Sequence, residues 1–332
     1  MREPFNLEKM RIAIFTGGDS SEYVISMKSA GQVLKWLEAA GHSCYLVEVK
    51  KDIWTVHVGE KRIPLDKNSF SYLYEDEKIT FDFVWNTIHG TPGEDGKLQG
   101  YFDIMGIPYS CSNHLSSALT FDKYTCKSFL KQHNVLTPEA SLVRKYLETD
   151  LEAVATLVGL PCFVKPNSGG SSFGIAKVGR LEELQAAVDE ALQEDDEAIV
   201  ERYIKGTEVT CGLMKGRDGF TLFPITEIIS KNEFFDYEAK YTKGKAEEIT
   251  PARIPEDTAK KCRALAMDIY NLTNCAGIIR VDFIIKGNQV YFLELNSIPG
   301  MSRESIIPKQ VRCMGLKMET VMQQVIEEAL GT

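Results

Sequence analysis

The stretch from Ala276 to Met301 constrains the fold most, because side chains that can bind a metal interrupt its apolar segments. Two such runs flank a Gly-Asn turn, which predicts a β-hairpin. Asp282 interrupts the first run, and Glu294 and Asn296 interrupt the second. Arg280 precedes Asp282 by two residues, so the polar residues of each strand share one face. Carboxylate and amide oxygens without histidine or thiolate are typical of a site for a hard cation such as Mg²⁺.

Whether the two polar faces coincide depends on the turn. A two-residue turn, 287–288, would pair Asp282 with Leu293 and place Glu294 on the opposite face. A three-residue turn, 287–289, would place Asp282 opposite Glu294. The metal site therefore requires the longer turn, or another strand register that also places Asp282 and Glu294 on the same face. The alternative is a strand pair with a polar, solvated face.

The composition is that of a soluble globular protein with two or three domains. The chain has 332 residues, of which 44% are hydrophobic and 26% charged, and more than one hydrophobic core is usual at this length. It lacks an apolar run long enough to span a membrane and a secretory-type N-terminus. Eight scattered cysteines without a C-x-x-C pair indicate reduced thiols, as expected in the cytoplasm. The net charge of −9 argues against a nucleic-acid partner.

The N-terminal part predicts a parallel βαβ unit. Residues 11–18 form an apolar strand that ends in a Gly-Gly turn, a helical pattern follows to Gly41, and 44–49 is a second strand. Glu22 stands at the start of the helix, where it either binds a ligand or only caps the helix. The chain contains no G-x-G-x-x-G sequence, which argues against a dinucleotide-dependent oxidoreductase.

Later segments indicate a phosphate-binding loop and a lid. Lys165 leads into the Gly/Ser loop 167–172 between two strands, and glycine lets backbone N–H groups approach a phosphate. An ordinary flexible hairpin has the same composition. We expect 116–135 to be one helix, which contains Lys123. The aromatic-rich segment 230–251 is long for a structureless connection, so we interpret it as a lid. Metal face, loop and lid together predict a site for ATP phosphoryl transfer.

Motifs along nearly the whole chain resemble the D-alanine–D-alanine ligases of the ATP-grasp superfamily. The motifs, in family order, are G-G-D-S-S-E (17–22), H-G-T-P-G-E-D-G (89–96), F-D-K (121–123), F-V-K-P-N-S-G-G-S-S-F-G (163–174), E-R-Y-I-K-G-T-E (201–208), D-Y-E-A-K-Y (236–241), R-V-D (280–282) and E-L-N-S-I-P-G-M-S-R-E-S (294–305). The resemblance implies an α/β fold with three domains. These are an N-terminal parallel βαβ substrate-binding domain at 1–114, a central ATP-grasp domain with the Gly/Ser loop at 115–208, and a C-terminal ATP-grasp domain with metal site and lid at 209–332.

The family chemistry that this resemblance implies has two steps and supplies peptidoglycan precursors. ATP phosphorylates the carboxylate of one D-alanine, and the amine of a second D-alanine attacks the acyl phosphate to give D-alanyl-D-alanine. The alternative is a ligase that uses D-lactate or D-serine as acceptor, although lactate users generally lack the 236–241 pattern. A non-catalytic nucleotide-binding protein is a further hypothesis, and it would not need an oxyanion donor such as Arg280.

The resemblance also implies a nucleotide and metal site. Its nucleotide contacts would be Lys123, Lys165, Glu201, Arg202, Tyr203, Ile204, Glu208 and Lys240. The lysines would neutralise phosphates, Glu201 and the backbone near Tyr203 and Ile204 would hold adenine, and Glu208 would bind the ribose. Arg202 replaces a common lysine and can still contact phosphate. Asp282, Glu294 and Asn296 would bind two Mg²⁺ ions, or Mn²⁺, that bridge phosphate oxygens.

The remaining implied roles concern the amino acids and the intermediate. The residues are Glu22, Ser171, Tyr241, Arg280, Gly300 and Ser305. Glu22 would bind the first ammonium group, and Ser305 the carboxylate of the second substrate. Arg280 and the Gly300 N–H would stabilise the oxyanion, and Glu22, Ser171 and Tyr241 would form a link that holds the lid closed. His89 would either orient the acceptor or only brace its loop. A homodimer is expected from the family alone.

Overall fold

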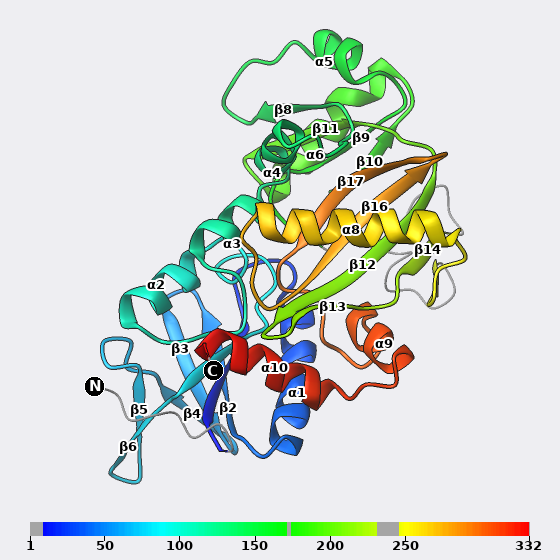
Figure 1. Cartoon of the computed structure of the whole chain (residues 1–332). Coiled ribbons are helices and arrows are strands. Elements are labelled where there is room, and N and C mark those ends of the chain that lie inside the picture. Colours follow the sequence, from blue (N-terminus) through cyan, green and yellow to red (C-terminus); the bar gives the residue numbers. More distant parts are fainter. Residues whose placement is uncertain (1–8, 171–173, 231–245, 332) are drawn as a thin grey trace.

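The computed structural model describes residues 9–170, 174–230 and 246–331. It contains three larger β-sheets with helices packed against them (Figure 1). None of the described helices has the length and apolar character needed to cross a membrane. The α-helices of the described residues are α1 (Tyr23–Ala39), α2 (Lys97–Met105), α3 (His114–Phe121), α4 (Lys123–Gln132), α5 (Leu151–Val158), α6 (Leu184–Glu194), α8 (Glu256–Leu272), α9 (Ile306–Cys313) and α10 (Met318–Leu330).

The first sheet contains the expected βαβ unit. Strands β1 and β2 are parallel, α1 connects them, and β1 also pairs in parallel with β7. The outer strands β3 and β4 add antiparallel pairs, so the sheet is mixed. Its strands and those of the adjoining β5–β6 hairpin are β1 (Arg11–Gly17), β2 (Ser43–Lys50), β3 (Ile53–Val58), β4 (Lys61–Pro64), β5 (Ser71–Tyr74), β6 (Glu77–Thr80) and β7 (Phe83–Asn86).

The segment expected as one helix at 116–135 is two helices. Asp122 has extended backbone angles, and its side chain accepts a hydrogen bond from the N–H of Thr125, so it caps α4. Aspartate is among the residues that favour this N-cap position. The prediction of one continuous helix is therefore wrong. The break makes Lys123 the first residue of α4 and turns it toward the Gly/Ser loop.

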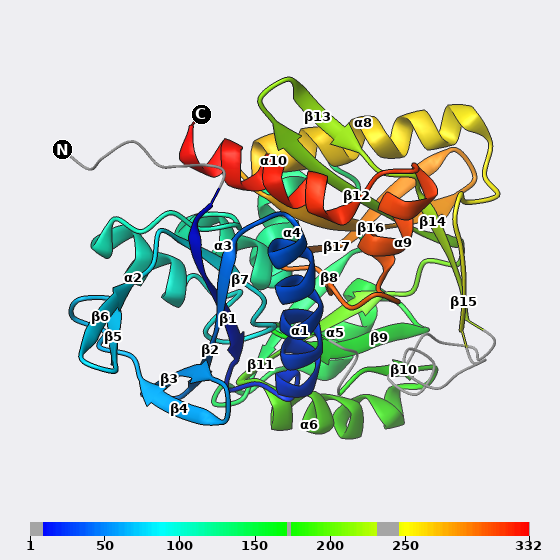
Figure 2. The same cartoon turned by 90° about the horizontal axis from the view of Figure 1, so that it is seen from below.

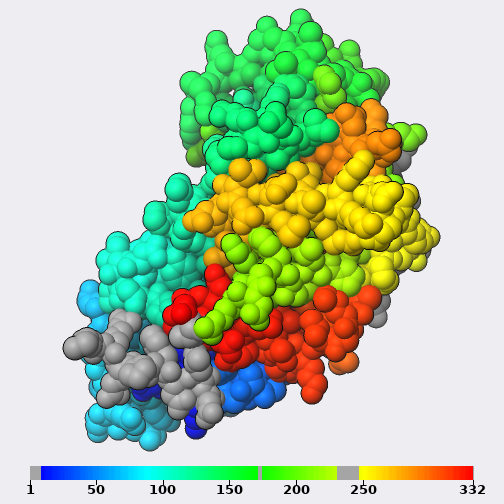
Figure 3. Space-filling model, viewed as in Figure 1, coloured from blue at the N-terminus to red at the C-terminus, as the bar shows by residue number. Residues whose placement is uncertain are grey.

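Two antiparallel sheets follow. The order β10-β9-β11-β8 makes a small sheet that packs on α5 and α6, and β15-β14-β12-β16-β17 makes a larger one beneath α8, with β13 beside β12. In space-filling view the small-sheet lobe (green) stands above α8 (yellow), with the N-terminal part (blue to cyan) below (Figure 3). The strands are β8 (Ala140–Arg144), β9 (Cys162–Pro166), β10 (Ala176–Val178), β11 (Glu197–Arg202), β12 (Thr207–Gly216), β13 (Gly219–Leu222), β14 (Thr226–Ser230), β15 (Ala246–Ile249), β16 (Ile278–Lys286) and β17 (Gln289–Asn296). The exact domain limits remain a prediction.

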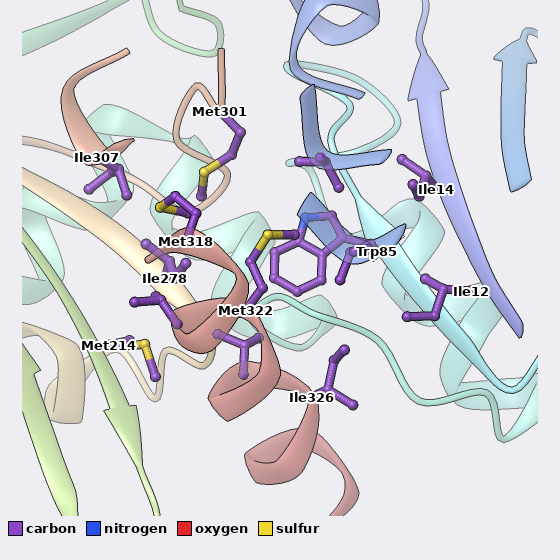
Figure 4. Packing of buried hydrophobic residues seen from close by; sticks show 14 of the residues in the cluster. Ile12, Ile14, Trp85, Met214, Ile278, Met301, Ile307, Met318, Met322 and Ile326 are labelled. Carbon is purple, nitrogen blue, oxygen red and sulfur yellow. The ribbon is translucent and has the colours of Figure 1, made fainter. Parts of the chain in front are cut away.

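One hydrophobic core joins the two ends of the chain. Helix α10 packs against α1 and β12, and Figure 2 shows it beside α1. Met318, Met322 and Ile326 of α10 lie in the same cluster as Ile12 of β1 and Trp85 of β7 (Figure 4). The C-terminal helix therefore holds the first sheet against the large sheet, which keeps the carboxyl ends of β1 and β7 near the end of β17.

Candidate functional site

The β16–β17 hairpin brings its polar residues to one face. Asp282 lies opposite Glu294, and Arg280 lies opposite Asn296. The turn has only two residues, because Lys286 already pairs with Gln289. The expected common face is confirmed, but the premise that a two-residue turn would separate Asp282 from Glu294 is wrong.

A β-bulge explains why Asp282 and Glu294 lie on the same face although the turn has only two residues. Phe283 pairs with Phe292, whereas the next residue back, Asp282, pairs with Glu294. Leu293 is the extra residue, so the register shifts by one at this point. A shift of one residue exchanges the faces of a strand. The bulge therefore turns Glu294 and Asn296 onto the face of Asp282.

Asp282 is the centre of a buried hydrogen-bond network. Arg280 donates from Nε to Oδ1 at 2.9 Å and from Nη2 to Oδ2 at 2.8 Å. Asn296 Nδ2 donates to Oδ2 at 3.1 Å, and the Thr210 hydroxyl donates to Oδ1. Burial alone would lower the pKa of Arg280, but the charge and hydrogen bonds of Asp282 raise it above its ordinary value. The site thus holds a permanent cation beside the carboxylates.

The donor set fits a hard cation that also binds phosphate. Within the described residues, no group of three or more His, Cys, Asp or Glu side chains gathers as a metal cluster. A cation on this face would therefore rest on Asp282, Glu294 and the Asn296 amide, with its remaining ligands from water or phosphate oxygens. Mg²⁺ is usually bound in this way, through one or two carboxylates and substrate phosphates.

A cavity of about 540 Å³ connects this face with the Gly/Ser loop. Residues from β9, β17, α4, the Gly/Ser loop and the loops after β1 and β7 line it, among them Glu22, Lys123, Lys165, Gly169, Gly170 and Glu294. A larger hollow of about 870 Å³ lies between α2 and the end of α10 and contains none of the predicted site residues. We place the candidate site in the smaller cavity, because Glu22, Lys123, Lys165 and Glu294 of the predicted site line it.

Two of the lysines expected at the phosphates, Lys123 and Lys165, line this cavity. Lys123 Nζ donates to the carbonyl oxygen of Gly169 at 2.5 Å, which ties α4 to the loop. Lys165 Nζ lies 2.6 Å from Glu201 Oε2. Burial lowers the pKa of Lys165 to about 8, the charge of Glu294 opposes this shift, and Lys123 adds to it. The repulsion between the two ammonium groups makes the cavity ready for an anion.

The residues expected around adenine and ribose lie beside Lys165. Glu201 is buried at the end of β11, and Glu208 in β12 is near enough to raise the pKa of Lys165. Tyr203 N–H donates to Pro161 O at 3.2 Å, so this amide is already used. Ile204 is buried. The arrangement brings these residues together, and their roles toward a nucleotide remain proposals.

Arg202 points away from the site, which corrects the expected phosphate contact. Its Nε donates to Val158 O at 2.7 Å and its Nη2 to Leu157 O at 3.1 Å. These carbonyls belong to the last turn of α5, where a cation is favoured by the helix dipole. Neighbouring residues of a strand face opposite sides, so buried Glu201 and exposed Arg202 cannot serve the same ligand through their side chains.

Replacement of Arg202 by methionine is therefore expected to affect stability and not nucleotide use. The lost hydrogen bonds to α5 should lower the free energy of unfolding by about 1–2 kcal/mol. The KM for ATP should stay at the wild-type value, whereas Lys165→Met should raise it. Urea unfolding and initial-rate kinetics measure the two effects. A raised KM in the Arg202 variant without loss of stability would contradict this placement.

Glu22 lies at the junction of three loops. It is buried at the N-cap of α1, and a Cβ atom built on Gly170 would lie 2.8 Å from its Oε1. Glu94 is close by: its Oε2 accepts from the N–H of Gly90 at 2.7 Å. Burial raises the pKa of Glu94 to about 8 and the charge of Glu22 adds to the shift, while N–H groups and Lys123 oppose it. An ammonium group placed here would neutralise closely spaced carboxylates.

The raised pKa of Glu94 predicts a pH-dependent stability. A carboxyl group that is harder to ionise in the folded state makes the folded state less stable as pH rises, from its unfolded pKa near 4.5 to its folded pKa of about 8. Relative to Glu94→Gln, which stays neutral, the wild-type free energy of unfolding should fall by at most about 5 kcal/mol over this window. Urea unfolding at several pH values tests it, with exposed Glu77→Gln as control. Parallel curves for wild type and Glu94→Gln would contradict the prediction.

The segment after β17 carries Gly300 and Ser305. Ser305 is the N-cap of α9 but its side chain makes no hydrogen bond to the helix amides; its Oγ lies 2.8 Å from Ser302 Oγ. A Cβ atom on Gly300 would lie 3.1 Å from Ser305 Oγ, so the backbone passes close to this hydroxyl. The N–H of Met301 donates to Ser29 Oγ at 3.2 Å, which ties the segment to α1. The N-terminus of α9 favours a carboxylate.

His89 is held within this junction. Its ring Nε2 lies 3.4 Å from Ser29 Oγ, its N–H donates to Ser26 Oγ at 3.0 Å, and its carbonyl accepts from Ser20. These contacts support the interpretation that His89 braces its loop against α1.

Comparisons with known proteins agree with this geometry. Residues 11–112 match the family model "D-ala D-ala ligase N-terminus", and residues 131–327 match "D-ala D-ala ligase C-terminus". The chain belongs to the D-alanine–D-alanine ligase family. It is 49% identical to the D-alanine–D-alanine ligase of Phocaeicola vulgatus over 96% of this chain and 99% of that protein. It is 46% identical to that of Bacteroides fragilis with the same coverage of both chains.

Solved structures of this ligase family have the same fold. The D-alanyl-alanine synthetase A of Vibrio cholerae superposes with a TM-score of 0.87, at 26% identity over 98% of this chain and 99% of that chain. The VanG D-Ala:D-Ser ligase of Enterococcus faecalis gives 0.82, at 30% identity over 97% and 99%. The ligase of Bacillus anthracis complexed with ATP gives 0.78, at 28% identity over 97% and 98%. The ATP-grasp prediction for the fold is confirmed.

Three residues predicted from the ligase motifs lie outside the described residues. They are Ser171, Lys240 and Tyr241, and most of the interpreted lid at 230–251 lies outside them as well. The expected Glu22–Ser171–Tyr241 link therefore stays a prediction.

Two buried residues of this ligase family member were not predicted from the sequence. Glu94 lies within a recognised motif, but its closeness to Glu22 depends on how two separate loops fold together. Lys127 donates a hydrogen bond to Glu201 from the next turn of α4 after Lys123. The four-residue spacing of these lysines was the available signal, since residues four apart share one face of a helix.

Proposed function

We propose that the chain joins two D-alanine molecules to D-alanyl-D-alanine at the expense of ATP, for peptidoglycan precursor synthesis. One observation carries the proposal: a single cavity gathers Glu22, the lysine pair Lys123 and Lys165, and Glu294, each from a different part of the fold. The first half-reaction requires a carboxylate that binds ammonium, a pair of cations that binds phosphate, and a metal ligand. The family membership supports the same activity.

In the first step the carboxylate of one D-alanine attacks the γ-phosphorus of ATP. Glu22 holds the ammonium group of that D-alanine, and Lys123 and Lys165 offset the charge of the phosphates. Two Mg²⁺ ions, held by Asp282, Glu294 and Asn296, would supply charge neutralisation on the phosphate oxygens. An oxygen–phosphorus bond forms, the bond to the β-phosphate oxygen breaks, and ADP leaves.

In the second step the amine of the other D-alanine attacks the acyl carbon. A carbon–nitrogen bond forms, the amine loses a proton, and the tetrahedral intermediate releases phosphate. Arg280 and the N–H of Gly300 stabilise its oxyanion, and Ser305 with the N-terminus of α9 binds the second carboxylate. These assignments place the oxyanion donors next to the metal face, where the acyl phosphate forms.

The remaining assignments complete this proposal. Glu201, Tyr203 and Ile204 contact adenine, Glu208 contacts ribose, and Lys240 reaches the γ-phosphate. Ser171 and Tyr241 link to Glu22 and exclude water from the acyl phosphate. We place the protein in the cytoplasm as a homodimer, without a nucleic-acid or membrane partner.

Dipeptide formation tests the activity. Purified protein with ATP, Mg²⁺ and D-alanine should release phosphate and yield D-alanyl-D-alanine by mass spectrometry. D-lactate and D-serine, offered in competition at several pH values, test the acceptor, because an amine must lose its proton to attack whereas a hydroxy acid carries no such ammonium group. Similarity to a D-Ala:D-Ser ligase makes D-serine the necessary comparison. Phosphate release without D-alanyl-D-alanine would overturn the proposal.

A further inference from the structure

Lys127 is a buried lysine that the proposed reaction does not use. It lies four residues after Lys123 in α4, so both side chains leave the same face of the helix. Its ammonium group donates to Glu201 Oε1, and only 4% of its side chain is exposed. A lysine is seldom buried this deeply, because an ammonium group loses its hydration there. The burial of Lys127 therefore requires a physical explanation.

Glu201 stands between two lysines. Lys127 contacts Oε1, and Lys165 Nζ lies 2.6 Å from Oε2. Lys165 reaches Glu201 from the neighbouring strand, since β9 pairs with β11. Lys165 also lines the cavity that contains Gly169 and Glu294. The ammonium group of Lys165 is therefore paired with Glu201, the carboxylate proposed to contact adenine. Lys165 nevertheless borders the cavity proposed for the phosphates.

We infer that Lys127 is a positioning residue that keeps Glu201 paired and in place when Lys165 moves from Glu201 to the phosphates of the nucleotide. The inference rests on the proposed function, which assigns Lys165 to phosphate. If Lys127 were absent, the move would leave Glu201 as a buried carboxylate without a counter-charge, and that state is strongly unfavourable. Lys127 thus strengthens the binding of phosphates that it does not touch.

The surrounding charges favour such a transfer. Burial and the charges of Lys165 and Lys123 all lower the pKa of Lys127, while Glu294 opposes them. The three ammonium groups therefore repel one another in a poorly hydrated space. A polyphosphate would relieve the repulsion by drawing Lys165 and Lys123 to itself, and it would leave Lys127 with Glu201 as an isolated ion pair.

Calorimetry with two ligands distinguishes a positioning role of Lys127 in phosphate binding from a purely structural role. Adenosine lacks phosphate, and ADP with Mg²⁺ carries it. In Lys127→Met, affinity for ADP should fall about ten- to hundredfold, because Lys165 stays on Glu201, whereas affinity for adenosine should change little. Lys131→Met is the matched control: it makes the same change one turn later in α4, at a half-exposed pair in which Lys131 Nζ lies 3.1 Å from Glu139. This control should bind both ligands as wild type does.

A second substitution tests the cause. Glu201→Gln added to Lys127→Met removes the charge that holds Lys165, so the preference for ADP over adenosine should return toward the wild-type ratio. Thermal unfolding checks each variant, and Lys127→Gln, which keeps a donor toward Glu201 without charge, replaces Lys127→Met if the latter does not fold.

Three results would overturn the inference but not the proposed function. In Lys127→Met, the affinities for ADP and adenosine could fall equally, or neither could fall. In the double variant, the preference for ADP could fail to recover. A wild-type protein that binds ADP no better than adenosine would overturn the proposed use of ATP, and the inference with it.

Discussion

Replacement of Glu294 by glutamine is expected to lower kcat/KM for ATP about a thousandfold or more, because a carboxylate ligand of the proposed metal site is lost. The bulge at Leu293 turns this residue toward Asp282, and it borders the cavity of the lysine pair. The amide is nearly the same size, so the fold should persist. Phosphate release at increasing Mg²⁺ and Mn²⁺ concentrations measures the effect, and a higher metal requirement should accompany the loss.

Glu227→Gln is the control for this change. Glu227 is a carboxylate of the same sheet, in β14, and pairs with the mostly exposed Arg253 at 2.9 Å. Its replacement should leave turnover within about twofold of wild type, because the pair lies outside the cavity and its arginine is mostly exposed to solvent. A Glu294 variant that turned over like this control would refute the metal assignment.

Replacement of Arg280 by methionine is expected to lower kcat about 10²–10³-fold, the usual effect of losing one oxyanion donor. The KM for ATP should change less, since the oxyanion exists only after phosphoryl transfer. The variant should also lose about 3–5 kcal/mol of stability, because Asp282 is left as a buried carboxylate without its ion-pair partner. Kinetics below the unfolding transition separate the two effects.

Two further variants distinguish catalysis from stability. Arg280→Lys keeps the charge beside Asp282 but not the two-pronged geometry, so it should recover stability more than kcat. Arg253→Met removes the comparable two-pronged pair with Glu227, in which the arginine is mostly exposed to solvent, and should alter neither property strongly. Recovery of full kcat in Arg280→Lys would show that only the charge matters and would contradict an oriented donor.

Periodic patterns predicted the elements of this chain well and their irregularities poorly. The alternation of polar and apolar residues located β16 and β17, and it placed Arg280 with Asp282 on one face of the first strand and Glu294 with Asn296 on one face of the second. The bulge at Leu293 was not predictable, because an extra residue changes the pairing without changing the local pattern. Asp122, by contrast, carried a usable signal, since aspartate before a helical run favours a new N-terminus.

The resemblance to the ligase family selected residues that the fold brings together, and it missed contacts that depend on how separate loops meet. Motifs named Glu22, Lys123, Lys165 and Glu201, and the fold brings them to connected spaces. Arg202 was misassigned, although strand alternation already placed it opposite Glu201. The contacts of Glu94 and Lys127 join separate parts of the chain, so only the folded structure could reveal these contacts. The four-residue spacing from Lys123 placed Lys127 on the same helix face, but it did not identify Glu201 as its partner.

The packing of α10 on α1 and β1 also affects how the chain can be made. The apolar face of the first sheet is complete only when Met318, Met322 and Ile326 cover it. During synthesis, roughly 15–60 s separate β1 from α10 at ordinary translation rates. For that time this face lies open to chaperones and to other chains. A ribosome that stalls before residue 318 therefore releases a product with an uncovered apolar surface, a mark by which quality-control proteases can recognise it.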